Sequence, residues 1–176
     1  MNADGGNKAR QLFGSFLGSG LFPIAPGTWG SAATILVFMV LFGVDGLFGG
    51  LLGGVEAGPE ATSPWLCRGI IVGILAVLFV VGVYVGDYAT VDWGRPDPGP
   101  FVMDEVVGQG LALLPLLPGT PGIAGYAVAF FLFRIFDVLK PSPCDRLESL
   151  AGGLGIMADD VAAGLYAMIL VIVLPL

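Results

Sequence analysis

The chain alternates long apolar runs with short polar segments, a pattern typical of helices that lie in a lipid bilayer. Five apolar runs cover residues 30–55, 69–86, 106–117, 122–136 and 161–176. A helix that crosses the hydrocarbon core needs about 20 apolar residues. The first run contains Asp45 and a cluster of glycines, so we expect its helix to end near Val44. The pattern therefore predicts a protein built from membrane helices.

The third and fourth apolar runs are short, and the segment PLLPGTPG at residues 115–122 separates them. Because proline and glycine end helices, this segment predicts a sharp turn. The two runs then form either a hairpin of short helices or a partly re-entrant pair, whose irregular backbone is tolerated only where protein shields it. The expected fold class is all-α: one integral membrane helical bundle over residues 1–176, with short or broken helices and about four to five membrane segments.

Composition supports a membrane location and argues against one class of partner. Hydrophobic residues make up 56% of the chain and charged residues 12%, about half the charged share of a soluble domain, and the mean hydropathy is +0.90. The net charge of −7 and an isoelectric point near 4.2 argue against nucleic acid as a partner. Cys67 and Cys144 are far apart and are expected to be free thiols.

The chain contains no histidine, which restricts its possible chemistry. A histidine nucleophile, a serine–histidine pair, a histidine base and a histidine-bound zinc ion are all excluded. Any catalysis must use carboxylates, hydroxyls, lysine, arginine and hard metal ions.

Basic residues place two acidic segments on the same side of the membrane. With five spans, one side receives Lys8, Arg10, Arg95, Lys140 and Arg146. Because cytoplasmic loops are rich in Lys and Arg, we expect the N-terminus in the cytoplasm and the C-terminus outside. Residues 87–105 and 137–160, which hold most of the carboxylates, then both lie at the cytoplasmic face. The two segments still share a side of the membrane if the third and fourth runs do not cross it.

Acidic residues gather at the ends of the apolar runs. Asp104 and Glu105 stand in MDEVVG before the third run, and Asp137 stands in RIFDVLKP at the end of the fourth. Asp159 and Asp160 of GIMADDVAAG are expected to open the last helix. A weaker group lies in the segment DYATVDWGRPDPG, before the third run, and comprises Asp87, Asp92 and Asp97. Acids at a helix N-terminus cap free N–H groups, so both adjacent pairs have a structural alternative as caps.

The two adjacent acid pairs exceed what capping requires, and they favour a metal site. Neighbouring helix residues point about 100° apart, so one acid of each pair can cap while the other faces the bundle. Carboxylates gathered at one face repel each other unless a cation neutralises them. Carboxylate oxygens without His or Cys suit Mg²⁺, usually together with a substrate phosphate. Arg134 and Lys140 are suited to hold phosphate oxygens, although Arg134 also fits a simple ion pair with Asp137.

The chain resembles the phosphatidylglycerophosphatase A family in four ordered motifs, GSGLFPIAPGTWGS, FVMDEVVGQ, FRIFDVLKP and GGLGIMADDVAAG. The matching blocks cover about residues 14–34, 92–110 and 130–164. The resemblance implies an all-helical, Mg²⁺-dependent lipid phosphatase of the bacterial inner membrane, with several membrane passes and an active site facing the cytoplasm. Such an enzyme removes the terminal phosphate of phosphatidylglycerophosphate to give phosphatidylglycerol, in phosphatidylglycerol and cardiolipin synthesis.

The resemblance also implies roles for individual residues. The acids expected to hold Mg²⁺ are Asp104, Glu105, Asp159, Asp160 and Asp97. The residues expected to bind phosphate are Arg134, Lys140, Thr28 and Ser31. The catalytic acids are Asp104, Glu105, Asp137 and Asp160. The resemblance does not settle which acid is the general base, and Asp137 and Asp160 are both candidates.

Two other classes of function compete with a phosphatase. A small membrane transporter or channel would use the acidic clusters to bind cations, and a non-catalytic scaffold would not need them. A transporter is expected to carry acids near the middle of its spans, whereas nearly all acids here lie at the ends of the apolar runs. This distribution favours the phosphatase.

Overall fold

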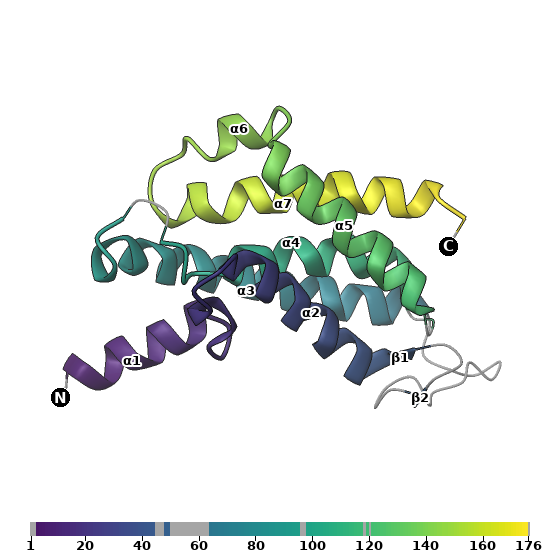
Figure 1. The fold of residues 1–176 in the computed structure, drawn as a ribbon, viewed down its shortest axis with the longest axis horizontal. Helices are drawn as coiled ribbons and strands as arrows, with labels where there is room; N and C mark the ends of the chain where they lie inside the picture. The colour runs from purple at the N-terminus through teal and green to yellow at the C-terminus, as the bar shows by residue number, and fades with distance from the viewer. Residues whose placement is uncertain are drawn as a thin grey trace.

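The computed structural model describes residues 3–44, 48–49, 64–95, 98–117, 119 and 121–175, which form a helical bundle (Figure 1). The helices are α1 (Ala3–Gly14), α2 (Pro26–Phe42), α3 (Pro64–Asp92), α4 (Met103–Leu113), α5 (Ile123–Leu139), α6 (Cys144–Leu147) and α7 (Gly153–Val173). Two 3₁₀ turns, η1 (Ser19–Leu21) and η2 (Leu114–Leu116), and one antiparallel pair, β1 (Gly43–Val44) with β2 (Phe48–Gly49), complete the described elements. Apart from this small pair the regular structure is helical, which confirms the expected all-α class.

Helix α4 occupies the centre of the bundle although it is short. It packs against α2, α3, α5 and α7 (Figure 1), and nine of its eleven residues are buried. Such a helix does not need the length of a membrane span, because neighbouring helices rather than lipid surround it. The expected hairpin of short helices is present, since α4 leads through η2 to α5 and packs against it.

Two glycines let α4 and α7 approach until their backbones touch. A Cβ atom added to Gly164 would overlap the carbonyl group of Gly108, and one added to Gly108 would lie 2.6 Å from the carbonyl oxygen of Asp160. Asp104 lies one turn before Gly108 in α4, and Asp160 lies one turn before Gly164 in α7. The two helices run in the same direction here, so the glycine contact brings these two carboxylates together.

Helix α3 packs against α7 in the opposite direction and also uses glycines. A Cβ atom added to Gly82 would lie 2.7 Å from the sulfur of Met157, and one added to Gly86 would lie 2.9 Å from the Cα atom of Gly153. The two contacts run antiparallel along the helices. They place the C-terminal end of α3 beside the N-terminal end of α7, at the end of the bundle that holds the acidic residues.

Two of the described helices are long and apolar enough to cross a membrane, by length and composition: residues Trp65–Val91 of α3 and Gly153–Val173 of α7. Helix α3 presents a wide exposed apolar surface that includes Ile70, Val77 and Val80. Large exposed apolar surfaces of this kind indicate contact with lipid or with another protein. The two helices suggest association with a membrane. The expected bundle of four to five spans is not confirmed, because α2, α4 and α5 are shorter.

The last helix begins earlier than its hydrophobic pattern predicts. The sequence indicates a start beside Asp159 and Asp160, but α7 begins at Gly153, so both acids lie well inside the helix. Their interpretation as N-terminal caps is therefore wrong. The glycine-rich segment before them is helical because it packs tightly on α3, where a Cβ atom on Gly153 would overlap the carbonyl group of Val83. The expected end of the first helix near Val44 agrees well with the structure, because α2 ends at Phe42. Asp45 lies outside the described residues.

Candidate active site

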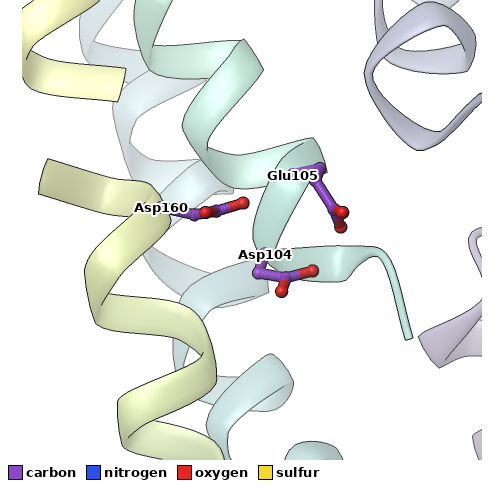
Figure 2. A group of neighbouring side chains, drawn as sticks. All are labelled: Asp104, Glu105 and Asp160. Atoms are coloured by element: carbon purple, nitrogen blue, oxygen red, sulfur yellow. The ribbon is translucent and has the colours of Figure 1, made fainter. Parts of the chain in front are cut away.

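Three carboxylates meet where α4 and α7 cross. Asp104 and Glu105 belong to the first turn of α4, and Asp160 points toward them from α7 (Figure 2). One carboxylate oxygen from each residue lies within 4.8 Å of the other two. Asp104 is 8% exposed and Asp160 only 3%. The group therefore concentrates negative charge at a buried point of the bundle.

These three side chains fit a hard divalent cation. The Oε2 atom of Glu105 and the Oδ2 atom of Asp160 are buried and have no hydrogen-bond partner, a state that costs free energy unless another group satisfies them. Oxygen donors from carboxylates, without nitrogen or sulfur, suit Mg²⁺ or a similar ion. A bound cation or an added proton would relieve the repulsion between the three groups.

Burial raises the pKa of Glu105 most, a hydrogen bond with Asp104 lowers it, the carboxylates of Asp160 and Asp137 raise it and the charge of Arg134 lowers it, which together give a pKa of about 8. A carboxyl group with a raised pKa in the folded state stabilises the protein while it is protonated, and this stability is lost as the pH rises through the folded-state pKa. The metal-free protein is thus expected to hold a proton in this cluster at neutral pH.

We expect the metal-free protein to lose stability as the pH rises from about 5 to 8. One carboxyl group contributes up to about 1.4 kcal/mol per pH unit in this window. Thermal unfolding in EDTA across this pH range measures the effect, and Glu105→Gln should flatten the slope because glutamine does not titrate. A slope that is the same in the variant would contradict the assignment to Glu105.

Arg134 links the carboxylate cluster to α5. Its Nη1 atom lies 2.6 Å from Asp137 Oδ2 and 3.9 Å from Glu105 Oε1. The expected ion pair between Arg134 and Asp137, one turn apart on the helix, is therefore present. All three side chains are mostly buried. Arg134 of α5 therefore lies between the carboxylate of Glu105 in α4 and that of Asp137 in the last turn of its own helix.

Lys140 is placed by the end of α5. The residue adopts a left-handed conformation with φ of 44° as the C-cap of the helix, and Pro141 follows it, so the helix cannot continue. Its Nζ atom lies 2.8 Å from Asp159 Oδ2 and 2.8 Å from Glu148 Oε1. Although burial lowers the pKa of Lys140, its hydrogen bonds to Asp159 and Glu148 raise the pKa above the usual value. Lys140 is therefore a permanent positive charge beside the cavity.

The charged groups surround one cavity of about 490 Å³ at this end of the bundle. Its charged lining comprises Asp104, Glu105, Asp137, Lys140, Glu148 and Asp159. Apolar side chains such as Phe101, Leu150 and Ile156 line other parts of the wall. The combination of carboxylates, a cation and an apolar wall suits a phosphorylated group that is attached to an apolar molecule.

A family comparison decides between the classes of function that the sequence left open. The family model described as phosphatidylglycerophosphatase A matches residues 12–175. The chain belongs to the phosphatidylglycerophosphatase A family. The family predicted from the four motifs is thus confirmed, and the protein is an enzyme of the phosphatase class. A transporter or a scaffold is not favoured.

Curated relatives agree with this family over most of their length. Phosphatidylglycerophosphatase A of Haemophilus influenzae is 37% identical over 88% of this chain and 81% of the relative. Phosphatidylglycerophosphatase A of Escherichia coli is 33% identical over 85% of this chain and 74% of the relative. A putative phosphatidylinositol-3-phosphatase of Bacteroides thetaiotaomicron is 35% identical over 92% of this chain and 91% of the relative. No solved structure matches the chain.

The structure gathers most, but not all, of the residues that the sequence singled out for this phosphatidylglycerophosphatase A site. Those that line the cavity or join the carboxylate group are Asp104, Glu105, Arg134, Asp137, Lys140, Asp159 and Asp160. Thr28 and Ser31 do not line the cavity, and Ser31 donates its hydroxyl proton to the carbonyl oxygen of Gly27 at 3.0 Å. Their expected role in phosphate binding stays a prediction. Asp97 lies outside the described residues.

Sequence reasoning missed two residues of the site. Glu148 follows the short helix α6 and holds Lys140, and no motif marked it. Gly27, at the N-terminal end of α2, provides space for the site: a Cβ atom there would overlap the carboxylate of Glu105 and lie 3.1 Å from Arg134 Nη1. The motif PGTWGS contained this signal, since a glycine inside a helix start needs a packing reason.

Gly27→Ala is expected to lower phosphate release about 10- to 100-fold, because the added methyl group displaces Glu105 and Arg134 and small displacements of catalytic groups reduce rates by this order. Phosphate release from a lipid phosphomonoester by the purified enzyme measures the effect. Gly99→Ala is the matched control: it also lines the cavity, but a Cβ atom there makes an ordinary contact at 3.6 Å with Pro26. Equal rates for the two variants would show that Gly27 is not required for space.

Proposed function

We propose that this enzyme is a Mg²⁺-dependent lipid phosphatase that converts phosphatidylglycerophosphate and water to phosphatidylglycerol and inorganic phosphate, in the synthesis of phosphatidylglycerol and cardiolipin. The observation that carries the proposal is the buried group of Asp104, Glu105 and Asp160 beside a cavity that Lys140 lines, with Arg134 3.9 Å from Glu105. Membership of the phosphatidylglycerophosphatase A family supplies the substrate class.

Asp104, Glu105 and Asp160 are the residues that would hold Mg²⁺. The ion, when bound, supplies positive charge to the phosphoryl oxygens and favours an ionised water molecule as the nucleophile. Asp159 lies next to Asp160 in α7, but its Oδ2 atom is engaged by Lys140. We therefore assign Asp159 the role of positioning Lys140 and place it outside the metal-binding group.

Arg134 and Lys140 bind the phosphoryl group in this proposal. Their N–H groups donate hydrogen bonds to its oxygens and stabilise the charge that spreads over them in the transition state. Asp137 accepts the proton of the attacking water, because it lines the cavity whereas Asp160 is not among the cavity-lining residues. The water oxygen bonds to phosphorus, the bond from phosphorus to the glycerol oxygen breaks, and that oxygen takes up a proton from solvent.

The enzyme would act at the cytoplasmic face of a bacterial inner membrane. We propose that α3 and α7 cross the bilayer, because both have the length and the apolar composition that crossing requires. The cavity lies where α3 ends and α7 begins, and the loops at this end carry Arg95, Lys140 and Arg146. These basic residues support the proposal that the cavity faces the cytoplasm.

Phosphate release from a panel of lipids in detergent micelles tests the proposal. The panel contains phosphatidylglycerophosphate, phosphatidylinositol 3-phosphate and phosphatidic acid, each assayed with Mg²⁺ and with EDTA. We expect the fastest release from phosphatidylglycerophosphate, and only with Mg²⁺. Faster release from phosphatidylinositol 3-phosphate would transfer the substrate assignment to the lipid named for the Bacteroides relative. No release from any lipid would refute the proposed activity.

A further inference from the structure

A second cavity lies between α2 and α5 and is almost entirely apolar. It has a volume of about 380 Å³ and is lined by Ala32, Leu36 and Met39 from α2 and by Tyr126, Ala127 and Phe131 from α5, among others. Leu36 and Phe131 are each 62% exposed, so the cavity is a groove that opens on the outside of the bundle. The one polar group among these six side chains, the hydroxyl of Tyr126, donates a hydrogen bond to the carbonyl oxygen of Gly43 at 2.9 Å.

The groove and the active site lie along the same two helices, α2 and α5. Gly27 of α2 faces Arg134 of α5 in the site, and at the other end of the pair Met39 and Tyr126 face the groove together. The two helices therefore run antiparallel, and the ends remote from the site lie together beside β1 (Figure 1). A ligand can thus contact the charged cavity and the groove without leaving the α2–α5 face.

The dimensions of the groove match one lipid chain. Phe131 lies three residues before Arg134, and Ala32 lies five residues after Gly27, so the groove begins about 5 to 8 Å from the site along the helix axes. It extends to Met39, about 18 Å from Gly27 by the same rise per residue. One leaflet of a bilayer has a hydrocarbon depth of about 15 Å. An extended acyl chain therefore spans the groove when its phosphate ester lies in the charged cavity.

We propose that this groove binds one acyl chain of the lipid substrate while the phosphate ester lies between Arg134 and Lys140. The inference rests on the proposed function, because it assumes a substrate that carries both a phosphomonoester and a long chain. The open rim at Leu36 and Phe131 lets the chain enter sideways from the bilayer. Burial of methylene groups along the groove then contributes binding free energy that a short-chain ester lacks.

Filling the groove with a large side chain should reduce the preference for long chains. We choose Ala127→Phe, because Ala127 lines the groove and is partly exposed. The ratio of kcat/KM for a sixteen-carbon phosphatidylglycerophosphate to that for its four-carbon analogue is expected to fall about tenfold, through KM for the long-chain ester. Ala76→Phe on the exposed side of α3 is the matched control and should leave the ratio unchanged.

A photocrosslinking experiment gives a readout that does not depend on activity. A phosphonate analogue of the long-chain lipid, with a diazirine in the middle of one chain, is irradiated with the wild-type enzyme in Mg²⁺. Peptides that contain residues 32–39 or 123–131 should carry the crosslink, and Ala127→Phe should reduce it. Crosslinks confined to α3 or α7 would overturn the groove assignment.

The outcomes separate this proposal from the proposed function. If the wild-type enzyme hydrolyses neither ester, the proposed activity fails, while crosslinks in the groove still support a bound lipid chain. If Ala127→Phe lowers kcat/KM for the long-chain and the short-chain ester equally, the groove does not determine the preference for chain length. If light scattering shows that Ala127→Phe breaks an oligomer while the chain-length ratio is unchanged, the groove is a contact between copies of the protein, and the proposal is wrong.

Discussion

Asp160→Asn is expected to lower Mg²⁺-dependent phosphate release by roughly 10²- to 10³-fold, the order observed when one electrostatic group is removed from an active site. Asparagine has nearly the same shape, so it removes one negative charge and one carboxylate oxygen without opening a cavity. Asp160 is 3% exposed and its oxygen lies within 4.8 Å of those of Asp104 and Glu105. The measurement is kcat/KM on phosphatidylglycerophosphate at saturating Mg²⁺.

Thermal unfolding distinguishes a lost metal site from a damaged fold. Mg²⁺ should raise the melting temperature of the wild type, because an ion that binds only the folded state stabilises it. The same addition should leave Asp160→Asn almost unchanged, while its melting temperature in EDTA stays at or above that of the wild type since one buried charge is gone. Asp145→Asn, at an exposed acid in α6, is the control and should retain both activity and stabilisation. If Asp160→Asn binds Mg²⁺ as the wild type does, the assignment is refuted.

Arg134→Gln should cause a loss of similar size, roughly 10²- to 10³-fold in kcat/KM, for a different reason. The variant removes the positive charge that lies 2.6 Å from Asp137 and 3.9 Å from Glu105, and with it the donor proposed for the phosphoryl oxygens. Arg134→Lys keeps the charge but loses the planar pair of donors, so its rate should fall between those of the wild type and the glutamine variant.

The pattern across these two variants tests the role of Arg134. If Arg134 acts on the phosphoryl group, inhibition by inorganic phosphate weakens in Arg134→Gln and recovers partly in Arg134→Lys. If Arg134 only neutralises its carboxylate neighbours, phosphate inhibition is unchanged while the melting temperature falls. A wild-type rate for the glutamine variant would exclude both roles.

The sequence was sufficient to predict which segments meet, because the segments carry a simple geometric signal. The acids and bases cluster at the ends of apolar runs, and helices of alternating direction return those ends to one side. The structure accordingly brings residues of α4, α5 and α7 to one cavity. The motifs predicted the family for the same reason, since four ordered blocks hold most of the residues that line this cavity.

Hydrophobic periodicity failed where tertiary packing, rather than composition, decides the structure. The start of α7 was placed too late because its glycine-rich first turns have low intrinsic helix propensity, yet they pack directly on α3. The number of spans could not be read from the apolar runs, because an apolar run does not reveal whether lipid or protein surrounds it. Helix α4 is apolar and buried by other helices, so its sequence resembles that of a short membrane segment.

Contacts between side chains could not be predicted from spacing alone. The motif predicts a role for Ser31 in phosphate binding, which stays a prediction, but it does not reveal that the hydroxyl donates to the carbonyl oxygen of Gly27 inside its own helix. Glu148 was missed because it lies in a polar segment where charged residues are common, and only the fold shows that it reaches Lys140. Gly27 carried a signal, but its meaning depends on the neighbours that the fold supplies.

The contact between Gly108 and Gly164 has a consequence for the choice of ion. The separation of Asp104 and Asp160 depends on how closely two main chains approach, and no side chain at the contact can shorten to adjust it. Mg²⁺ binds oxygen at about 2.0 to 2.1 Å, and Ca²⁺ at about 2.3 to 2.6 Å with more ligands. We therefore expect the proposed Mg²⁺ site to favour the smaller ion, because helices at minimum distance offer little room for longer metal–oxygen bonds. On this proposal, a preference for Mg²⁺ over Ca²⁺ would follow from helix packing.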